Sequence, residues 1–378
     1  MKEQLTFDKG RPETTRGIRA HDASNTLQLS ARQWLALAAL AVVLGMAVPA
    51  LWPRLEQLSF AADYRMPFEL SNDYWLYERC TRAATAQSDV LVVGDSVVWG
   101  QYVKREQTLT HYLNERAGRE RFANLGLDGA HPAALAGLVE HFASGLRGKT
   151  ILLECNLLWM SSPQHDLQEQ KEFDFNHPAL VPQFYPHIPC YRADVSTRLG
   201  NVVDRNSAFN AWTRHVQQVY FGHSTIPEWT LEHPYANPLQ AITLTLPATG
   251  GKLRHKAEPW TQQGIAPQDF PWVALDYSFQ WRSFRRAVDI LQRRENRVIV
   301  LLAPFNEHML TAGSRERFAQ LKAGVIASLR GDHIACIAPA LLPSEAYADA
   351  SHPLACGYKQ LADELFASNV LGTAEPGR

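Results

Sequence analysis

Cysteine is scarce in this sequence, which has five cysteines among 378 residues and no Cys-x-x-Cys pair. A small, odd set does not make a disulfide scaffold, although one bridge stays open for an exported domain. Neither the cysteines nor the scattered histidines have metal-ligand spacing, so we expect no bound metal, and no motif predicts a cofactor. Blocks of basic residues are also missing and the net charge is −1, which argues against nucleic-acid binding.

Charge is absent from residues 33–53, an apolar run in which nineteen residues extend from Trp34 to Trp52. As a helix these nineteen residues span about 28 Å, close to the hydrocarbon thickness of a bilayer. We therefore predict a single transmembrane helix over 33–53. A cleaved signal peptide and a buried core helix are the alternatives that the sequence leaves open.

The distribution of positive charge around this run predicts its orientation. The segment 1–32 carries Lys2, Lys9, Arg11, Arg16, Arg19 and Arg32, whereas Arg54 behind the run is soon followed by Glu56. The positive-inside rule then predicts a cytoplasmic tail over 1–32 and an extracytoplasmic remainder, periplasmic or at the cell surface. Residues 54–87 form a connector whose many aromatic residues should pack on the following domain.

Five apolar strands alternate with amphipathic helices in the rest of the chain. Continuous apolar strands separated by helices predict an α/β fold with a mostly parallel five-stranded sheet that is covered on both faces. The predicted strands are 89–93, 122–125, 150–155, 298–303 and 334–338, and the helices are 107–117, 132–146, 278–294, 314–330 and a last one over Leu354–Leu365.

The segment 161–275 interrupts this alternation. It holds 12 of the 22 prolines, 7 of the 14 histidines and 4 of the 10 tryptophans, and it is too long for a plain loop. We interpret it as an insertion between the third strand and the next core helix. It forms either a lid or glycan-facing wall, or a structural cover for the sheet.

Two short motifs follow the first and the last predicted strand. Gly94-Asp95-Ser96 comes directly after one, and Asp349 and His352, three residues apart, come after the other. Because the carboxyl ends of parallel strands meet at one edge of a sheet, these residues should converge. They then supply the parts of a hydrolytic triad: Ser96 as nucleophile, His352 as base and Asp349 to orient the base.

An acyl-transfer triad also needs donors for the oxyanion of its tetrahedral intermediate. Candidate donors are the backbone N–H groups of Ser96 and Gly129 and the side-chain amide of Asn156, all placed after strands. Gly126 is an alternative to Gly129, and a turn-capping role is an alternative for Asn156.

Two further groups lie near the same edge. Asn306-Glu307-His308 follows the fourth strand and either contacts substrate or caps a loop. Trp99 and Gln101, just past the nucleophile, either line an acyl pocket or pack in the core.

Together these motifs resemble the SGNH (GDSL-type) hydrolase family, over residues 88–160 and 276–371. In that family Ser, Gly, Asn and His lie in separate blocks, with Asp three residues before His. The resemblance implies a three-layer α/β/α, flavodoxin-like fold and serine esterase activity. The third block departs from the pattern, because Glu154-Cys155-Asn156-Leu157 stands where the family has Gly-x-Asn-Asp.

The combination with a membrane anchor is similar in architecture to alginate O-acetylation and teichoic-acid D-alanylation proteins. This similarity implies a serine esterase or O-acyltransferase for a small acyl group, acetyl above all, on an envelope or exported polysaccharide. It also implies a multi-pass membrane acyltransferase as donor partner. One alternative is a catalytically silent binding or assembly component of an envelope polysaccharide machine, and another is a secreted lipase-like esterase.

Overall fold

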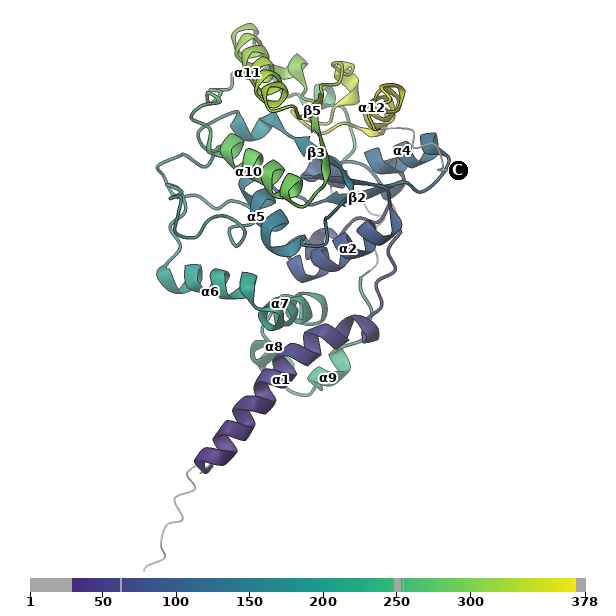
Figure 1. Ribbon diagram of the computed structural model, residues 1–378. Coiled ribbons are helices and arrows are strands. Elements are labelled where there is room, and N and C mark those ends of the chain that lie inside the picture. The colour runs from purple at the N-terminus through teal and green to yellow at the C-terminus, as the bar shows by residue number, and fades with distance from the viewer. Residues whose placement is uncertain (1–28, 62, 248–252, 254, 372–378) are drawn as a thin grey trace, which may run out of the picture. The chain divides into compact units, whose positions relative to one another are not determined.

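The computed structural model describes residues 29–61, 63–247, 253 and 255–371, and Figure 1 shows its elements in chain order. The chain divides into two compact units at the boundary between Leu44 and Gly45. Helix α1 (Ala31–Leu55) contains this boundary and includes the predicted span 33–53. It is long and apolar enough to cross a membrane by length and composition. Most of the predicted cytoplasmic tail, residues 1–28, lies outside the described residues.

A five-stranded, all-parallel sheet forms the centre of the second unit, in the order β2-β1-β3-β4-β5. The predicted strands are confirmed, with ends that differ by at most one residue. The connection from β1 leads to β2 on one side, and the connection from β2 crosses back to β3 on the other side of β1. Such a reversal of strand order is a switch point, which leaves a crevice at the carboxyl edge of the sheet. The strands are β1 (Val90–Gly94), β2 (Phe122–Gly126), β3 (Thr150–Cys155), β4 (Arg297–Leu302) and β5 (Ala335–Ile337).

Helices pack on both faces of this sheet, because alternate strand residues belong to two different clusters of buried side chains. Leu91 and Val93 pack with one set of helices, and Val90 and Val92 pack with the other. Burial on both faces explains why the strands are continuously apolar. The first set is α2 (Tyr74–Gln87), α5 (Pro132–Phe142), α10 (Phe279–Arg293) and α11 (Ala312–Gly331), and the second is α3 (Ser96–Trp99), α4 (Leu109–Ala117) and α12 (Ala355–Ala367).

The predicted connector 54–87 contains a helix that the sequence analysis does not identify. Helix α2 begins after Asp73, whose side chain accepts a hydrogen bond from the Leu76 N–H at 2.9 Å. Its buried residues include Trp75 and Tyr77, so the aromatic side chains pack on the domain as expected. The sequence pattern does not predict this helix, because its buried face combines aromatic, small and polar residues and has no regular aliphatic stripe.

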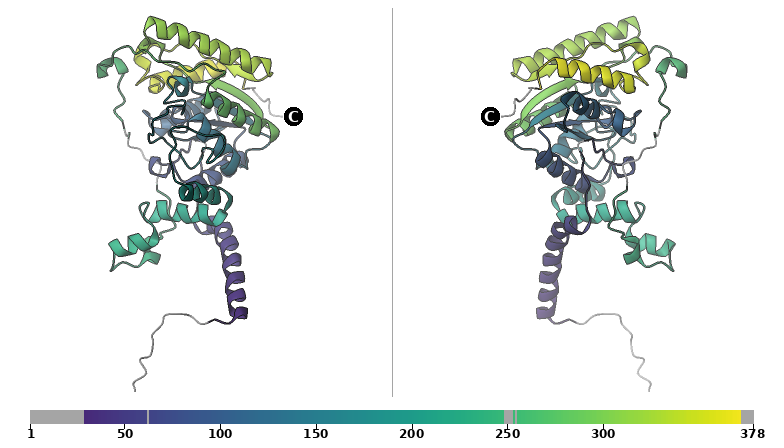
Figure 2. Two further views of the ribbon diagram at one scale, coloured as in Figure 1. Left: turned by 90° about the vertical axis from the view of Figure 1, so that its left-hand side faces the viewer. Right: turned by 90° about the vertical axis from the view of Figure 1, so that its right-hand side faces the viewer.

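The predicted insertion lies between β3 and α10 and belongs to the same compact unit as the sheet. Figures 1 and 2 show its helices gathered at the end of this unit where the last residues of α1 join it. The insertion residues that precede α6 run along the outside of α5 and α10 (Figure 1), whereas those that follow α9 lie beside residues 55–61 and then reach Tyr347 through Trp260. The helices are α6 (Val195–Asn206), α7 (Ala208–Tyr220), α8 (Ile226–Glu232) and α9 (Pro238–Ala241).

Candidate active site

Ser96 lies just beyond β1, as the first residue of the short helix α3. Asp95 caps this helix, because its Oδ1 accepts a hydrogen bond from the Val97 N–H at 2.8 Å. The cap fixes the turn that carries Ser96. Within the described chain, the backbone N–H of Ser96 donates to no other group. An N–H in the first turn of a helix suits negative charge, so it can serve an oxyanion.

Ser96, His352 and Asp349 form a continuous chain of hydrogen bonds. The Ser96 Oγ lies 2.8 Å from His352 Nε2, and His352 Nδ1 lies 2.8 Å from both carboxylate oxygens of Asp349. Ser96 and His352 are buried, while Asp349 is partly exposed. The structure therefore brings together the three residues of the two distant motifs, in the order nucleophile, base and orienting carboxylate.

The loop that carries Asp349 and His352 is held from two sides. Asp349 Oδ1 accepts the backbone N–H groups of Ser351 and His352, both at 2.9 Å. Asn306, which is fully buried, donates its Nδ2 to the Asp349 carbonyl at 3.1 Å and its backbone N–H to Ala350 at 2.9 Å. Of the two roles left open for Asn306, the structure shows the loop cap, and it places that cap on the loop of the base.

The charges of Asp349 and His352 stabilise each other. Burial alone would raise the pKa of Asp349, but the His352 charge and the hydrogen bonds from its ring and from nearby backbone N–H groups lower it below its usual value. Burial alone would lower the pKa of His352, but the Asp349 charge and hydrogen bond raise it above 6.5. The Asp349 carboxylate thus favours the protonated form of His352, which is the property that a group accepting the Ser96 proton would need.

Asn156 follows β3, and its side chain makes two hydrogen bonds. Its Oδ1 accepts the Leu158 N–H at 3.0 Å, which caps the 3₁₀ helix η3 (Leu157–Met160). Its Nδ2 donates to Asp95 Oδ2 at 2.9 Å, an oxygen that also accepts from Trp159 Nε1 at 2.8 Å. The turn-capping role is therefore present. Only one of the two amide hydrogens is used by these contacts, so the oxyanion role stays a prediction.

Glu154 is one of the two residues, with Leu157, at which the third block departs from the SGNH pattern, and it packs against the turn that carries Ser96. Its Oε2 accepts the backbone N–H of Asp95 at 3.0 Å. A Cβ added at Gly94 would lie 2.5 Å from this oxygen, which explains the glycine before Asp95. Burial and then the Asp95 charge raise the pKa of Glu154 well above its usual value, which favours the neutral carboxyl.

Gly129 lies beyond β2 with a φ of 71°, in the left-handed region that favours glycine. Its carbonyl accepts the His131 N–H, while its own N–H donates to no other group of the described chain. A Cβ added at Gly129 would lie 2.4 Å from Nδ2 of Asn176, a residue of the insertion. Gly126, the alternative donor, is the last residue of β2, and its N–H donates to Asn124 Oδ1 at 2.9 Å. The contacts therefore favour Gly129.

The insertion reaches the site from two directions. On one side His177 Nε2 lies 2.7 Å from the Asp128 carbonyl, next to Gly129. On the other, the ring of Tyr102 has its centroid 5.5 Å from that of His352 and 5.3 Å from that of His255. Trp260 continues this second wall, since its N–H donates to the Tyr347 carbonyl at 3.0 Å. We call these two insertion segments the walls of the site: one lies next to Gly129, and the other lies next to Tyr102, whose ring lies beside His352.

Tyr102, Trp159 and Asn176 are site residues that the sequence analysis misses. Only Trp159 carries a signal, as an aromatic residue three positions after Asn156. Trp99, by contrast, is buried and its Nε1 donates to the Met66 carbonyl at 2.8 Å, so it packs in the core. Gln101 is partly exposed, and its backbone N–H donates to the Ser96 carbonyl at 3.2 Å.

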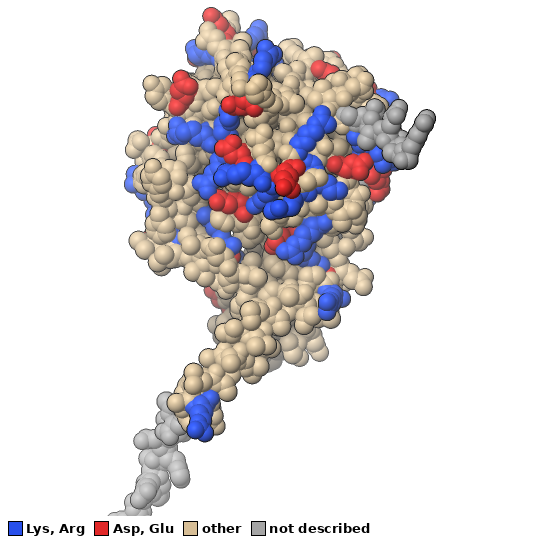
Figure 3. All heavy atoms as spheres, viewed as in Figure 1, with Lys and Arg blue, Asp and Glu red and all other residues tan. Residues whose placement is uncertain are grey.

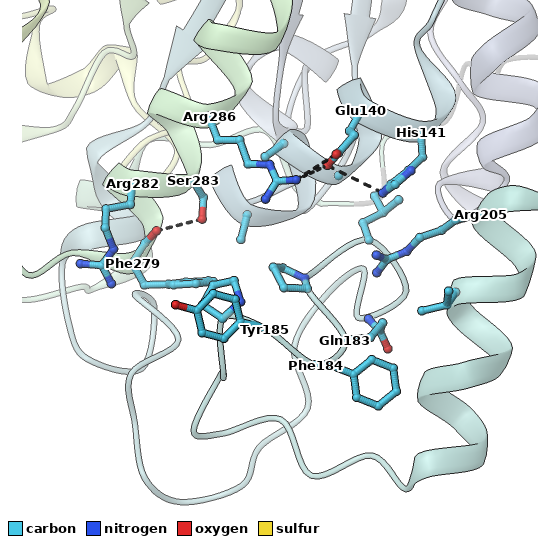
Figure 4. A pocket seen from close by; sticks show the side chains of 17 residues that line it. Glu140, His141, Gln183, Phe184, Tyr185, Arg205, Phe279, Arg282, Ser283 and Arg286 are labelled. Atoms are coloured by element: carbon cyan, nitrogen blue, oxygen red, sulfur yellow. Dashed lines mark hydrogen bonds and ion pairs between the residues drawn. The ribbon is translucent and has the colours of Figure 1, made fainter.

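A cavity of about 590 Å³ lies outside the triad, between helices α5 and α10 and the insertion (Figure 4). None of the predicted catalytic or oxyanion residues lines it. Phe184 and Tyr185 line it from the insertion, and Arg286, which pairs with Glu140 at 2.7 Å, lines it from α10. Aromatic rings beside an arginine and a carboxylate are suited to polar ring-shaped ligands such as sugars.

Comparison with known proteins does not identify a family, since the sequence matches no family model and no curated protein. The five cysteines are all free, and three of them are buried. Within the described ranges no group of three or more His, Cys, Asp or Glu side chains is arranged to hold a metal ion.

Proposed function

We propose that this protein is a membrane-anchored serine esterase or O-acyltransferase of the SGNH type. Its substrate is a small acyl ester, acetyl above all, of an envelope or exported polysaccharide. The observation that carries the proposal is the hydrogen-bonded chain from Ser96 through His352 to Asp349. The motifs, the parallel sheet and helices on both of its faces support the three-layer, flavodoxin-like arrangement of that family.

The first half of the reaction would form an acyl-enzyme. The Ser96 Oγ attacks the ester carbonyl carbon as His352 Nε2 accepts its proton, and Asp349 stabilises the resulting imidazolium. The carbonyl oxygen becomes an oxyanion that the N–H groups of Ser96 and Gly129 and the amide of Asn156 receive. The intermediate then collapses, the bond to the leaving oxygen breaks, and His352 returns the proton to that oxygen.

The second half would transfer the acyl group. Water or a sugar hydroxyl attacks the acyl carbon while His352 again accepts a proton, and Ser96 is released when the proton returns to its Oγ. The insertion residues beside the triad, Asn176 and His255 among them, would decide which acceptor enters. Transfer to a sugar requires that the walls admit a hydroxyl and exclude water.

The anchor would place this chemistry outside the cytoplasm. The length and composition of α1 support a single membrane span, and the basic residues before it support an inside N-terminus. A multi-pass membrane acyltransferase would supply the acyl group in a transfer reaction. That partner is expected from the architecture that the sequence resembles.

The test uses the full chain in detergent, with a serine-reactive fluorophosphonate and p-nitrophenyl acetate as probes. Wild type should be labelled and should hydrolyse the ester, and Ser96→Ala should lose both. Ser196→Ala, a change at an exposed serine of α6, is the matched control and should behave as wild type. A folded wild type that is neither labelled nor active, or a Ser96→Ala variant that is labelled equally, would contradict the proposal. Faster acyl release when oligosaccharide is added would favour transfer over hydrolysis.

A second candidate is a binding or assembly component without catalysis. The cavity lined by Phe184, Tyr185 and Arg286 favours it, because this cavity is separate from the triad. Polysaccharide binding that survives Ser96→Ala, together with the absence of turnover in wild type, would select this function.

A further inference from the structure

Large apolar side chains are exposed on the insertion helices. In a water-soluble protein single exposed apolar residues are ordinary, but an extended group of them marks an interaction surface. Leu231 and Leu239 are 81% and 77% exposed. We call the group the apolar base, and its members are Leu199, Val203, Phe209, Leu231, Tyr235 and Leu239.

Helix α6 shows that this exposure has a pattern. Arg198 and Arg205 donate hydrogen bonds to backbone carbonyls of the preceding insertion segment, and Asn201 is buried against Gln183 and Tyr191. These residues hold one face of the helix. Val195, Leu199 and Val203 follow one another at i, i+4 spacing on a different face, and all three are exposed. The helix thus presents an unpartnered apolar stripe.

Helix α7, which carries Phe209 of the apolar base, packs on the last residues of α1. The ring of Trp52 lies 5.2 Å from that of Trp212 on α7, and a Cβ added at Gly45 would lie 4.0 Å from the ring of Phe209. Glu56, the first residue after α1, is fully buried, and His215 of α7 lies 2.9 Å from its Oε1. The apolar base is therefore joined through α7 to the C-terminal end of α1.

Charge is balanced in this region. Residues 195–242 contain three arginines, three acidic residues and no lysine. Figure 3 shows acidic and basic side chains crowded over the upper part of the domain, while the lower part of the same face is mainly uncharged. A neutral surface that exposes leucine, valine, phenylalanine and tyrosine fits the interfacial layer of a bilayer, where tyrosine and tryptophan are enriched. It does not fit a polyanion.

We propose that the apolar base lies in the interfacial layer of the membrane that α1 spans. The inference rests on the membrane span of the proposed function and extends it, since the domain is then seated on the bilayer and not only tethered to it. Seating would restrict the domain to one orientation, with its active edge at a fixed height above the lipid. The insertion would then have a second role, in addition to forming the walls of the site.

The test places nitroxide spin labels on the full chain reconstituted in phosphatidylcholine nanodiscs. Cys336→Ala and Cys356→Ser first remove the two cysteines that are not buried. Single cysteines then report on the base at Leu199, Leu231 and Leu239, on the span at Val42, and on water at Arg330, an exposed residue of α11. The measurement is the ratio of collisions with oxygen, which concentrates in lipid, to collisions with a water-soluble nickel chelate.

The expected result is a ratio at the base positions well above that at position 330 and closer to that at position 42. If the collision ratio at the base positions equals that at position 330 while position 42 is in lipid, the proposal for the apolar base is wrong, although the membrane span is supported. If position 42 is also in water, the membrane span itself fails. A base that is in water in nanodiscs but protected in native membranes would assign the surface to a protein partner, and that outcome also overturns the proposal.

Discussion

The side-chain amide of Asn156 donates a hydrogen bond to the carboxylate of Asp95, 2.9 Å away. One amide hydrogen is thereby fixed, and no hydrogen bond within the described residues uses the second. Preorganisation of this kind is what an oxyanion donor requires, because no reorganisation is then needed during the reaction. The same bond also ties the third strand to the nucleophile turn, so Asn156 has a structural role beside the proposed catalytic one.

Replacement of Asn156 by alanine separates the two roles. If the amide receives the oxyanion, kcat should fall about 100-fold to 1,000-fold with little change in KM. Steady-state kinetics with p-nitrophenyl acetate measures the first effect, and thermal unfolding measures the structural one. A variant that melts earlier but retains kcat would show that Asn156 serves only as a cap.

The pH dependence of activity should follow the protonation of His352. The imidazolium cannot accept the Ser96 proton, so kcat/KM should fall as the pH drops through the pKa of His352, which Asp349 raises above 6.5. Asp349→Asn should lower the rate and move this acid limb toward lower pH, because the charge that raises the pKa is gone. His352→Ala should abolish activity at every pH. If the acid limb of the pH profile lies at the same pH in Asp349→Asn as in wild type, Asp349 is not the carboxylate that raises the pKa of His352.

Glu154 offers a test of the support beneath the nucleophile. Glu154→Gln should keep nearly full activity and stability, since its amide oxygen can still accept the Asp95 N–H and the native carboxyl favours the neutral form. Glu154→Ala should lose about 1–3 kcal/mol of stability, because the buried Asp95 N–H is left unpaired. Urea unfolding of both variants gives the comparison. Equal losses in the two would mean that the carboxylate charge matters, contrary to this interpretation.

The buried ion pairs of His215 with Glu56 and Asp73, next to the end of α1, should make the free energy of unfolding depend on pH. Burial opposes the charge of His215, but Asp73 and Glu56 raise its pKa from 6.5 to about 9. Its stabilisation is therefore complete below pH 6.5 and is lost between pH 6.5 and about 9, a change on the order of 3 kcal/mol. Burial also opposes the charge of Glu56, but His215, Tyr220 and Arg79 lower its pKa from 4.5 to about 2, so its contribution is lost below pH 4.5.

Thermal unfolding of the full chain in detergent at several pH values measures this effect. Wild type should be most stable between pH 4.5 and 6.5. His215→Gln, which cannot be charged, should be less stable there and should show little further loss toward pH 9. A wild type that is equally stable at pH 6 and pH 9 would contradict the assigned charge states.

Much of the architecture could be predicted from the pattern of residues in the sequence alone. The strands were predicted because a strand buried on both faces is continuously apolar, as in Val90–Gly94, and this property is local. Ser96 was found because it comes just beyond β1, and Asp349 and His352 because they lie three residues apart in the segment between β5 and the last helix, and parallel strands bring such segments to one edge. Helix α2 was missed because its packing face is made of aromatic and small residues and not of a regular aliphatic stripe.

The sequence by itself determined the parallel sheet, the apolar run of α1 and the residues at the strand ends, since each depends on neighbours in the chain. The tertiary structure decided what surrounds the triad. Asn176 reaches Gly129, Tyr102 reaches His352, and Asn306 holds the loop of the base only through contacts between distant segments, which no local spacing encodes. It likewise decided that the apolar residues of α6, α8 and α9 stay exposed, because burial depends on which surfaces meet in the folded chain.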